Sequence, residues 1–313
     1  GRWVAETETK DIAGFHINEL YSPWRKFSEV VFEFLASKDY PEKLKTWVNT
    51  SLGEVWKEQG EQADPTSLIS RLEDYDEIPK RLARTGGVDV QKDRLECTII
   101  DWHEGEEAYT MDHLIIPGDT AQPTVWNELD EELSHWSPEY VAIDSGYNTS
   151  MVYAYVEKRR WACAVKGRAG QGIPLVEDEK SRRQRMRRQR KKGILVHLVG
   201  DNQAKSLIYS RLKITKKGPG YIHFPNDSAF DDEYFAQLTA ERLITKTIRG
   251  VPTAEWLQTR PRNETLDCFK YALAALRLSG IDLKARHAAR NTEKPATPKP
   301  KPKQPAKLPN IGW

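Results

Sequence analysis

Four acidic residues have the chemical type and the spacing to hold divalent metal ions. Asp89 stands between two valines in a stretch that favours a β-strand, and Asp144 ends a second apolar, strand-like segment. Glu264 and Asp267 are three residues apart, so they share one face of a helix. Burying and gathering carboxylates is unfavourable unless cations neutralise them. Hard cations such as Mg²⁺ and Mn²⁺ accept oxygen ligands of this kind, so we predict that these acids bind two such ions.

Each acid also has an ordinary structural interpretation. Asp89 could cap the turn made by the two glycines before it, and Asp144 precedes Ser and Gly, a combination that is common in turns. Asp267 could be a solvated helix residue. Asp231 is expected to cap the N-terminus of a helix, and it is the first reserve if Asp267, with or without Glu264, does not complete the site.

Rigid strands and a helix are needed to position these acids. Three β-type runs, 87–91, 94–102 and 108–118, are separated by short polar turns, which predicts an antiparallel three-stranded meander. Residues 124–136 space their apolar side chains as a helix does, and residues 140–146 form a compact apolar strand. The pattern therefore predicts an α/β fold that begins β-β-β-α-β, with a mixed sheet flanked by helices.

The second half of the chain continues this alternation. We expect helices at 150–158, 202–212, 231–243 and 263–278, and strands at 161–167, 193–200, 221–225, 243–250 and 254–258. The last of these helices lines one face with leucine and phenylalanine and carries both Glu264 and Asp267.

Shifts in composition divide the chain into four predicted regions. Residues 1–62 alternate aromatic-rich pieces with short helices, and residues 63–84, which are polar and contain two prolines, are expected to form a linker. Residues 85–284 carry the sheet and the acids. Residues 285–313 are rich in proline and lysine and cannot bury enough surface to fold alone, so we predict a disordered tail.

One basic run stands out although the net charge of the chain is only +2. Nine lysines and arginines lie between residues 180 and 192 with no acid among them. Such a run is commonly a solvated loop, but beside a metal site it favours DNA, because a duplex attracts a positive strip through counterion release. The predicted DNA-binding residues are Arg182, Arg183, Arg185, Arg187, Arg188, Arg190, Lys191, Lys192 and Lys205. No base-reading motif accompanies them, so we expect contacts with the DNA backbone.

Several classes of protein are excluded by what the sequence lacks. Three cysteines without a CxxC pair and seven scattered histidines exclude a disulfide framework and a zinc knuckle. No GxxxxGK[ST] loop occurs, so a motor ATPase is not predicted. No apolar run could span a bilayer and no signal peptide is readable, so we expect a soluble, intracellular protein with reduced, mostly buried cysteines.

The ordered set of motifs resembles the ribonuclease H-like nuclease domain of the large terminase subunit of tailed bacteriophages of the lambda GpA type. The motifs that carry the resemblance are GGVDVQKDRLE, YVAIDSGYNTSMVYAYV, DDEYFAQLTAERL and RNETLDCFKYALAALRL, preceded by GFHINELYSPW and LKTWVNTSLGE. By this resemblance Asp89, Asp144 and Asp267 fall on the metal-binding acids of the family.

The resemblance also implies a function. A nuclease of this kind cuts concatemeric double-stranded viral DNA during genome packaging, with two Mg²⁺ or Mn²⁺ ions, in the host cell cytoplasm at the procapsid. The implied partners are double-stranded DNA, the small terminase subunit, the portal protein and further copies of the large subunit in the packaging motor.

We further expect the chain to be the C-terminal part of a longer large subunit, in which residues 1–62 join the nuclease to an ATPase motor. Two alternatives stay open. One is a non-catalytic DNA-binding or portal-docking module, and the other is a resolvase-type or integrase-type nuclease on the same fold.

Overall fold

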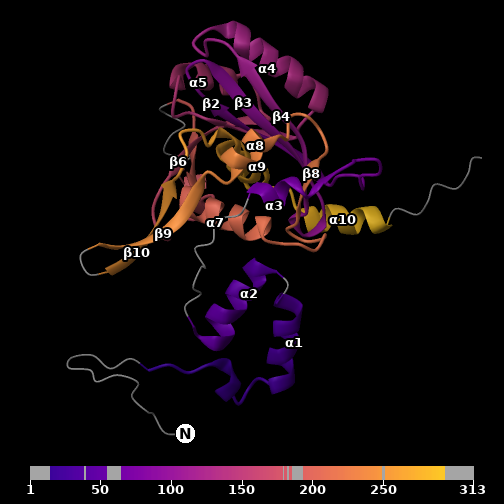
Figure 1. The fold of residues 1–313 in the computed structure, drawn as a ribbon, viewed down its shortest axis with the longest axis vertical. Helices are drawn as coiled ribbons and strands as arrows, with labels where there is room; N and C mark the ends of the chain where they lie inside the picture. Colours follow the sequence, from indigo (N-terminus) through magenta and orange to yellow (C-terminus); the bar gives the residue numbers. More distant parts are fainter. Residues whose placement is uncertain are drawn as a thin grey trace, which may run out of the picture.

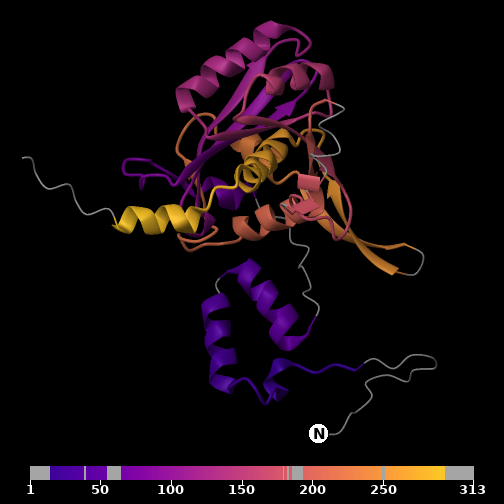
Figure 2. The ribbon, with the colours of Figure 1, turned by 180° about the vertical axis from the view of Figure 1, so that it is seen from behind.

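The chain folds around one large mixed β-sheet with helices on both faces. The computed structural model describes residues 15–38, 40–54, 65–178, 180–181, 183–184, 193–248 and 251–292. Within them, a helical hairpin near the N-terminus lies below the sheet, and a two-stranded ribbon projects from one side (Figures 1 and 2). The predicted α/β architecture, a mixed sheet flanked by helices, is confirmed.

Eight strands of the described chain form the large sheet, and two form the ribbon. In chain order the strands are β1 (Leu72–Glu73), β2 (Ala83–Val90), β3 (Arg94–Trp102), β4 (Ala108–Pro117), β5 (Tyr140–Asp144), β6 (Ala162–Arg168), β7 (Val196–Gly200), β8 (Ile222–Pro225), β9 (Glu241–Ile248) and β10 (Val251–Gln258). The order across the sheet is β1-β8-β4-β3-β2-β5-β6-β7.

The first strands pair as the sequence predicted. β2, β3 and β4 form the antiparallel meander, and β5, β6 and β7 continue the sheet beyond β2 in parallel. On the other side of the meander, β8 pairs parallel with β4, and β1 pairs parallel with β8. The pairing of β1 with β8 joins segments about 150 residues apart, and no local pattern in the sequence predicts it.

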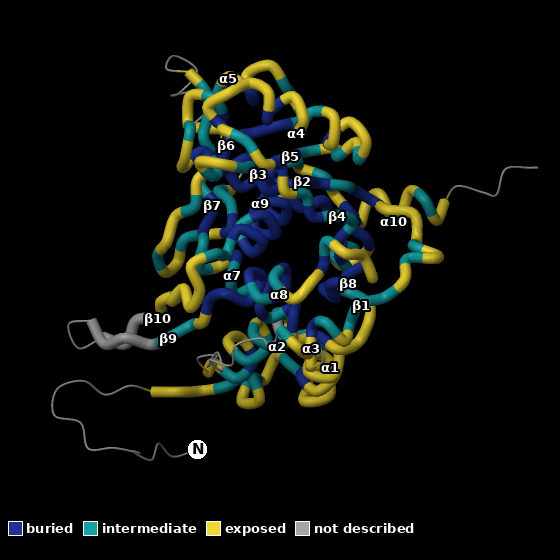
Figure 3. Tube along the Cα trace, turned by 45° about the horizontal axis from the view of Figure 1, so that its top comes forward, coloured by how far each residue is buried: buried dark blue, intermediate teal, exposed yellow. Residues whose placement is uncertain are grey.

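Helices cover both faces of this sheet. The helices of the described chain are α1 (Phe27–Ser37), α2 (Pro41–Trp47), α3 (Pro65–Ile69), α4 (Pro123–Trp136), α5 (Thr149–Glu157), α7 (Asp201–Leu212), α8 (Asp232–Leu238), α9 (Glu264–Ser279) and α10 (Leu283–Thr292), with short turns η1 (Glu19–Tyr21), η2 (Val48–Leu52) and η3 (Glu104–Glu106). Apolar side chains of α4 and α5 pack on one face, and those of α7, α8 and α9 pack on the other. Figure 3 shows α9 and the central strands as the most deeply buried part of the molecule.

Strand alternation decides which face each side chain of β2 meets. Val88 and Val90 are buried in the cluster that includes α4 and α5. Because successive side chains of a strand point to opposite faces, Thr85, Gly87 and Asp89 point toward α9. The carboxylate of Asp89 is thus directed at α9, the helix that carries Glu264 and Asp267.

Three boundaries differ from the prediction. The expected linker 63–84 contains α3 and β1, and Leu68 of α3 lies in the core. The helix expected at 231–243 ends at Leu238, because Glu241 already pairs with Gln258 in the ribbon. The helix α10 continues to Thr292, beyond the predicted start of the tail, and residues 293–313 lie outside the described residues.

Cys97, Cys163 and Cys268 are all buried and unbridged, as predicted. No helix among the described residues has the length and apolar character needed to cross a bilayer.

A separate unit is formed by η1, α1, α2 and η2. It contacts the sheet domain through α2 and α7, where the Arg211 guanidinium lies 2.6 Å from the Glu42 carboxylate. Many large apolar side chains of this unit are exposed. The exposed large side chains on it are Phe15, Ile17, Leu20, Tyr21, Trp24, Phe27, Val31, Phe32, Phe34 and Leu35.

Candidate metal and nucleic-acid site

Two of the predicted acids lie on adjacent parallel strands. The register of β2 and β5 pairs Val88 with Ile143, and Asp89 and Asp144 are the next residue on each strand. Ala142 belongs to the same core cluster as α9, so alternation directs Asp144 toward α9 as well. The two carboxylates therefore stand side by side at one point of the sheet.

The third acid is brought to this point by the close approach of α9. A Cβ atom added to Gly87 would lie 2.0 Å from the carbonyl oxygen of Cys268 and 2.2 Å from the amide nitrogen of Ala272. The hydroxyl of Thr85 donates a hydrogen bond of 2.8 Å to the Ala272 carbonyl. Only a glycine allows α9 to lie this close, and the contact fixes Asp267 above the strand that carries Asp89.

The three aspartates repel one another electrostatically. Asp89 is only 4% exposed. Burial raises the pKa of Asp89 to about 8, and the negative charges of Asp267 and Asp144 add to the rise. Burial also raises the pKa of Asp144, although hydrogen bonds from the Gly146 amide and the Tyr271 hydroxyl oppose this. The cluster thus carries more negative charge than its surroundings stabilise.

A buried lysine supplies part of the missing positive charge. Lys270 is 3% exposed, and its Nζ donates to Asp267 Oδ1 at 2.6 Å and to Asp201 Oδ1 at 2.8 Å. Burial by itself would lower the pKa of Lys270, but the charges of Asp267 and Asp201 help to raise it well above the ordinary value. Lys270 is therefore an ammonium ion between two carboxylates.

Glu264 is held in a different group of charges. Its carboxylate accepts hydrogen bonds from Arg94 at 2.5 Å and from Arg262 at 3.3 Å. The same two arginines bind Glu96, which is fully buried on β3. Glu264 could therefore join the three aspartates only by leaving both arginines. Asp231, the alternative candidate for the third acid, caps the N-terminus of α8 by accepting a hydrogen bond from the amide of Tyr234, as predicted.

The donor set suits a hard divalent cation. Carboxylate oxygens of three residues on rigid elements lie near one another here, and divalent cations such as Mg²⁺ prefer such ligands. In the described part of the chain, no three His, Cys, Asp or Glu side chains are already arranged to hold a metal ion.

Most of the predicted DNA-binding run falls outside the described residues. Arg182, Arg185, Arg187, Arg188, Arg190, Lys191 and Lys192 lie there. Arg183 is described and exposed. Lys205 is on α7, and its Nζ lies 2.7 Å from both oxygens of Glu241.

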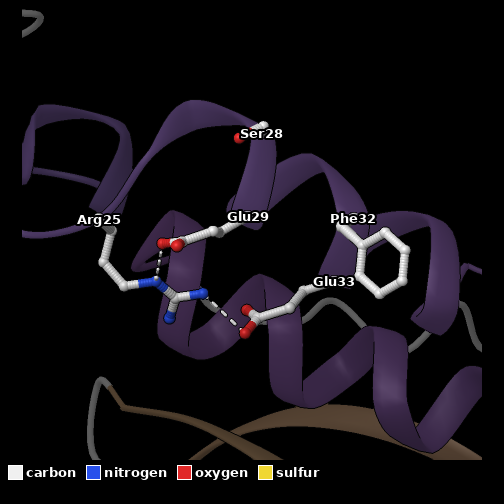
Figure 4. Close-up of a pocket in the computed structure, with 5 residues that line it drawn as sticks. All are labelled: Arg25, Ser28, Glu29, Phe32 and Glu33. Carbon is white, nitrogen blue, oxygen red and sulfur yellow. Dashed lines mark ion pairs between the residues drawn. The ribbon is translucent and has the colours of Figure 1, made fainter.

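A hollow lies beside α1, in the unit formed by η1, α1, α2 and η2 (Figure 4). It is lined by Arg25, Ser28, Glu29, Phe32 and Glu33. Arg25 forms ion pairs with Glu33 at 2.6 Å and with Glu29 at 3.9 Å, so its single positive charge is shared between these carboxylates.

The sequence analysis missed three side chains of this site. Asp201 stands where the sequence predicts the start of a helix, an ordinary place for an aspartate, and Lys270 and Tyr271 were not singled out. A signal was present, since Lys270 interrupts the apolar face of its helix three residues after Asp267. Asp201 follows a strand end directly, which is where parallel sheets bind ligands.

Comparison with known proteins identifies close sequence relatives. Residues 12–288 match the family model described as terminase large subunit gpA, endonuclease domain. The terminase large subunit of Escherichia phage lambda is 34% identical over 294 residues, which are 88% of this chain and 45% of that protein. The chain thus spans about half the length of the curated relatives it matches.

Solved structures with a similar arrangement are more distant. A manganese-containing structure of a mutant nuclease domain of the large terminase subunit gp2 of bacterial virus Sf6 has a TM-score of 0.44 and 13% identity, over 67% of this chain and 97% of that one. RuvC of Thermus thermophilus in complex with a Holliday junction substrate has a TM-score of 0.28 and 14% identity, over 66% of this chain and 96% of that one.

Proposed function

Because the chain belongs to the family of terminase large subunit gpA endonuclease domains, we propose that it cuts concatemeric double-stranded DNA during viral genome packaging by metal-dependent hydrolysis. The observation that carries the proposal is that Asp89, Asp144 and Asp267 are neighbours where β2, β5 and α9 meet, with Asp89 buried. Three carboxylates gathered there lower the stability of the fold, and bound cations would offset this cost.

We assign the three aspartates as ligands of Mg²⁺ or Mn²⁺. Two such ions, when bound, activate a water for attack on the phosphorus and stabilise the leaving 3′ oxygen. The chain contributes rigidity: Asp89 is fixed by its strand and by Gln91, whose amide donates to its carboxylate at 2.5 Å. Glu264 is the least supported ligand of the predicted set, because Arg94 and Arg262 already bind it.

DNA would be gripped by the basic run between residues 180 and 192. The run lies between β6 and β7, two of the parallel strands whose carboxyl ends neighbour the acids. A basic segment of this kind would bind the phosphates that flank the scissile bond. Lys205 would have to leave Glu241 to take part, so the run itself is the stronger candidate.

The unit formed by residues 15–54 supports the proposed joining role of residues 1–62. So many exposed apolar side chains in one small unit favour an interaction site. We assign this unit to contact with the motor portion of a longer large subunit. The small terminase subunit, the portal and further copies of the large subunit are the proposed partners, at the procapsid in the host cell cytoplasm.

The proposal is tested by cleavage of supercoiled plasmid in the presence of Mn²⁺. The parent chain should cut, and Asp89→Ala and Asp144→Ala should not, while both variants still fold and retain DNA. Glu157→Ala, which changes an exposed acid of α5, is the matched control and should cut as the parent does. Equal nicking by all four proteins would contradict the assignment. Four-way junctions cut far better than linear duplex would favour a resolvase instead.

A further inference from the structure

The pair formed by Lys270 and Asp201 has no role in the ligand set proposed above. Lys270 is buried, and its ammonium is shared between Asp267, a proposed metal ligand, and Asp201. An ammonium ion and a divalent cation compete for the same carboxylate, because each is stabilised by its negative charge. The contacts of Lys270 therefore bear directly on metal binding.

Asp201 is held firmly in its place beside Lys270. It is the first residue of α7 and follows the last residue of β7, so its backbone is fixed by the sheet. A Cβ atom added to Gly167 of β6 would lie 2.8 Å from Asp201 Oδ1. The glycine thus leaves the space into which the Asp201 carboxylate fits.

We propose that Lys270 is a permanent positive partner of the acid cluster and that Asp201 is a positioning residue. Asp201 shares the ammonium with Asp267 and so weakens its hold on Asp267, which leaves Asp267 available to a divalent cation. This inference rests on the proposed function, since it concerns the metal affinity of the same site.

Removal of either partner should change metal affinity, in opposite directions. Lys270→Met keeps the length of the side chain but removes its positive charge, so the cluster becomes more negative and binds Mn²⁺ more tightly. Asp201→Asn removes a negative charge and leaves the ammonium to Asp267 alone, so Mn²⁺ binds more weakly. Each change should be on the order of ten-fold, as expected for one charge in direct contact with a partly buried site. The double variant should lie between them.

The test is a titration of the full chain with Mn²⁺, followed by the electron paramagnetic resonance signal of the unbound ion. The matched control is Asp130→Asn. It also removes a carboxylate from an ion pair, that with Arg159, but on α4 at the opposite face of the sheet, and it should leave the Mn²⁺ affinity unchanged. A pair that serves only stability would lower the melting temperature in both variants and shift the affinity in neither.

The outcomes separate the two proposals. A parent chain that binds no Mn²⁺ overturns the proposed function and this inference with it. Binding that is lost in Asp89→Ala, yet unchanged in both Lys270→Met and Asp201→Asn or changed in the same direction, overturns this inference alone. If Lys270→Met does not fold, Asp201→Asn decides: weaker Mn²⁺ binding supports the inference, and equal or tighter binding overturns it.

Discussion

Substitution of Gly87 by alanine should disable the site without touching an acid. The added Cβ would lie 2.0 Å from the Cys268 carbonyl and 2.2 Å from the Ala272 amide, and both are backbone atoms of α9. Neither can rotate away. To restore an ordinary contact of 3.4 Å, α9 would have to retreat by about 1.4 Å.

Two consequences follow from this retreat. Forcing one extra methyl group into a packed interior costs about 1–3 kcal/mol of unfolding free energy. Asp267 would move with α9, and a misplacement of about 1 Å at a catalytic site can reduce the rate by about 100-fold. We therefore expect Gly87→Ala to lower the midpoint of urea unfolding and to weaken both Mn²⁺ binding and plasmid cleavage.

The neighbouring glycine provides the control. A Cβ atom on Gly86 would point to the opposite face and lie 3.3 Å from side-chain methyl groups of Ile99 and Val141, which can shift. Gly86→Ala should consequently keep most of the cleavage activity. The reasoning is refuted if Gly87→Ala unfolds at the same urea concentration as the parent and binds Mn²⁺ equally well.

Three further predictions concern other parts of the chain. Burial alone would raise the pKa of Glu96, but His113, Arg94 and Arg262 lower it to about 2. The ionised Glu96 therefore stabilises the fold at a pH above 4.5, its ordinary pKa, and this stabilisation is lost as the pH falls toward 2. Glu96→Gln should cost up to about 3 kcal/mol at pH 7 and remove this acid-dependent loss, as measured by urea unfolding at pH 7 and pH 3; an unchanged pH dependence would contradict it. Replacing three arginines of the 180–192 run by glutamine should reduce the slope of the logarithm of DNA affinity against the logarithm of salt concentration by up to about 2.7. A slope equal to that of the parent would exclude the run from the DNA contact. Phe32 is 73% exposed, so Phe32→Ser should change the unfolding free energy by less than about 0.5 kcal/mol and should reduce the binding of an apolar dye. A large loss of stability would show that the Phe32 side chain is already covered.

The sheet could be predicted where its pairings are local. Alternation along β2 and the short turns to β3 and β4 predicted the meander, and β5 was predicted as a strand. The parallel pairing of β5 with β2, which puts Asp89 next to Asp144, is not a local one. The insertion of β8 beside β4 could not be predicted, because parallel pairing of distant segments depends on the packing of the whole chain. The early end of α8 has the same origin, since the ribbon pairs Glu241 with a residue 17 positions later.

The site was predictable in its acids but not in its compensating charges. Carboxylates at strand ends give a readable signal, whereas Asp201 at a helix start and Lys270 within a long helix have common structural explanations. Only the close packing of α9 on Gly87 brings these groups together. That contact joins residues about 180 positions apart, and a glycine in a strand does not by itself indicate which distant segment will pack against it.

The place of α9 in the chain has a consequence for biosynthesis. A ribosome delivers the strands with Asp89 and Asp144 first, and the helix with Asp267 emerges more than 120 residues after Asp144. A polypeptide that ends before α9 therefore holds only two of the three aspartates, and the proposed metal site would require this late helix.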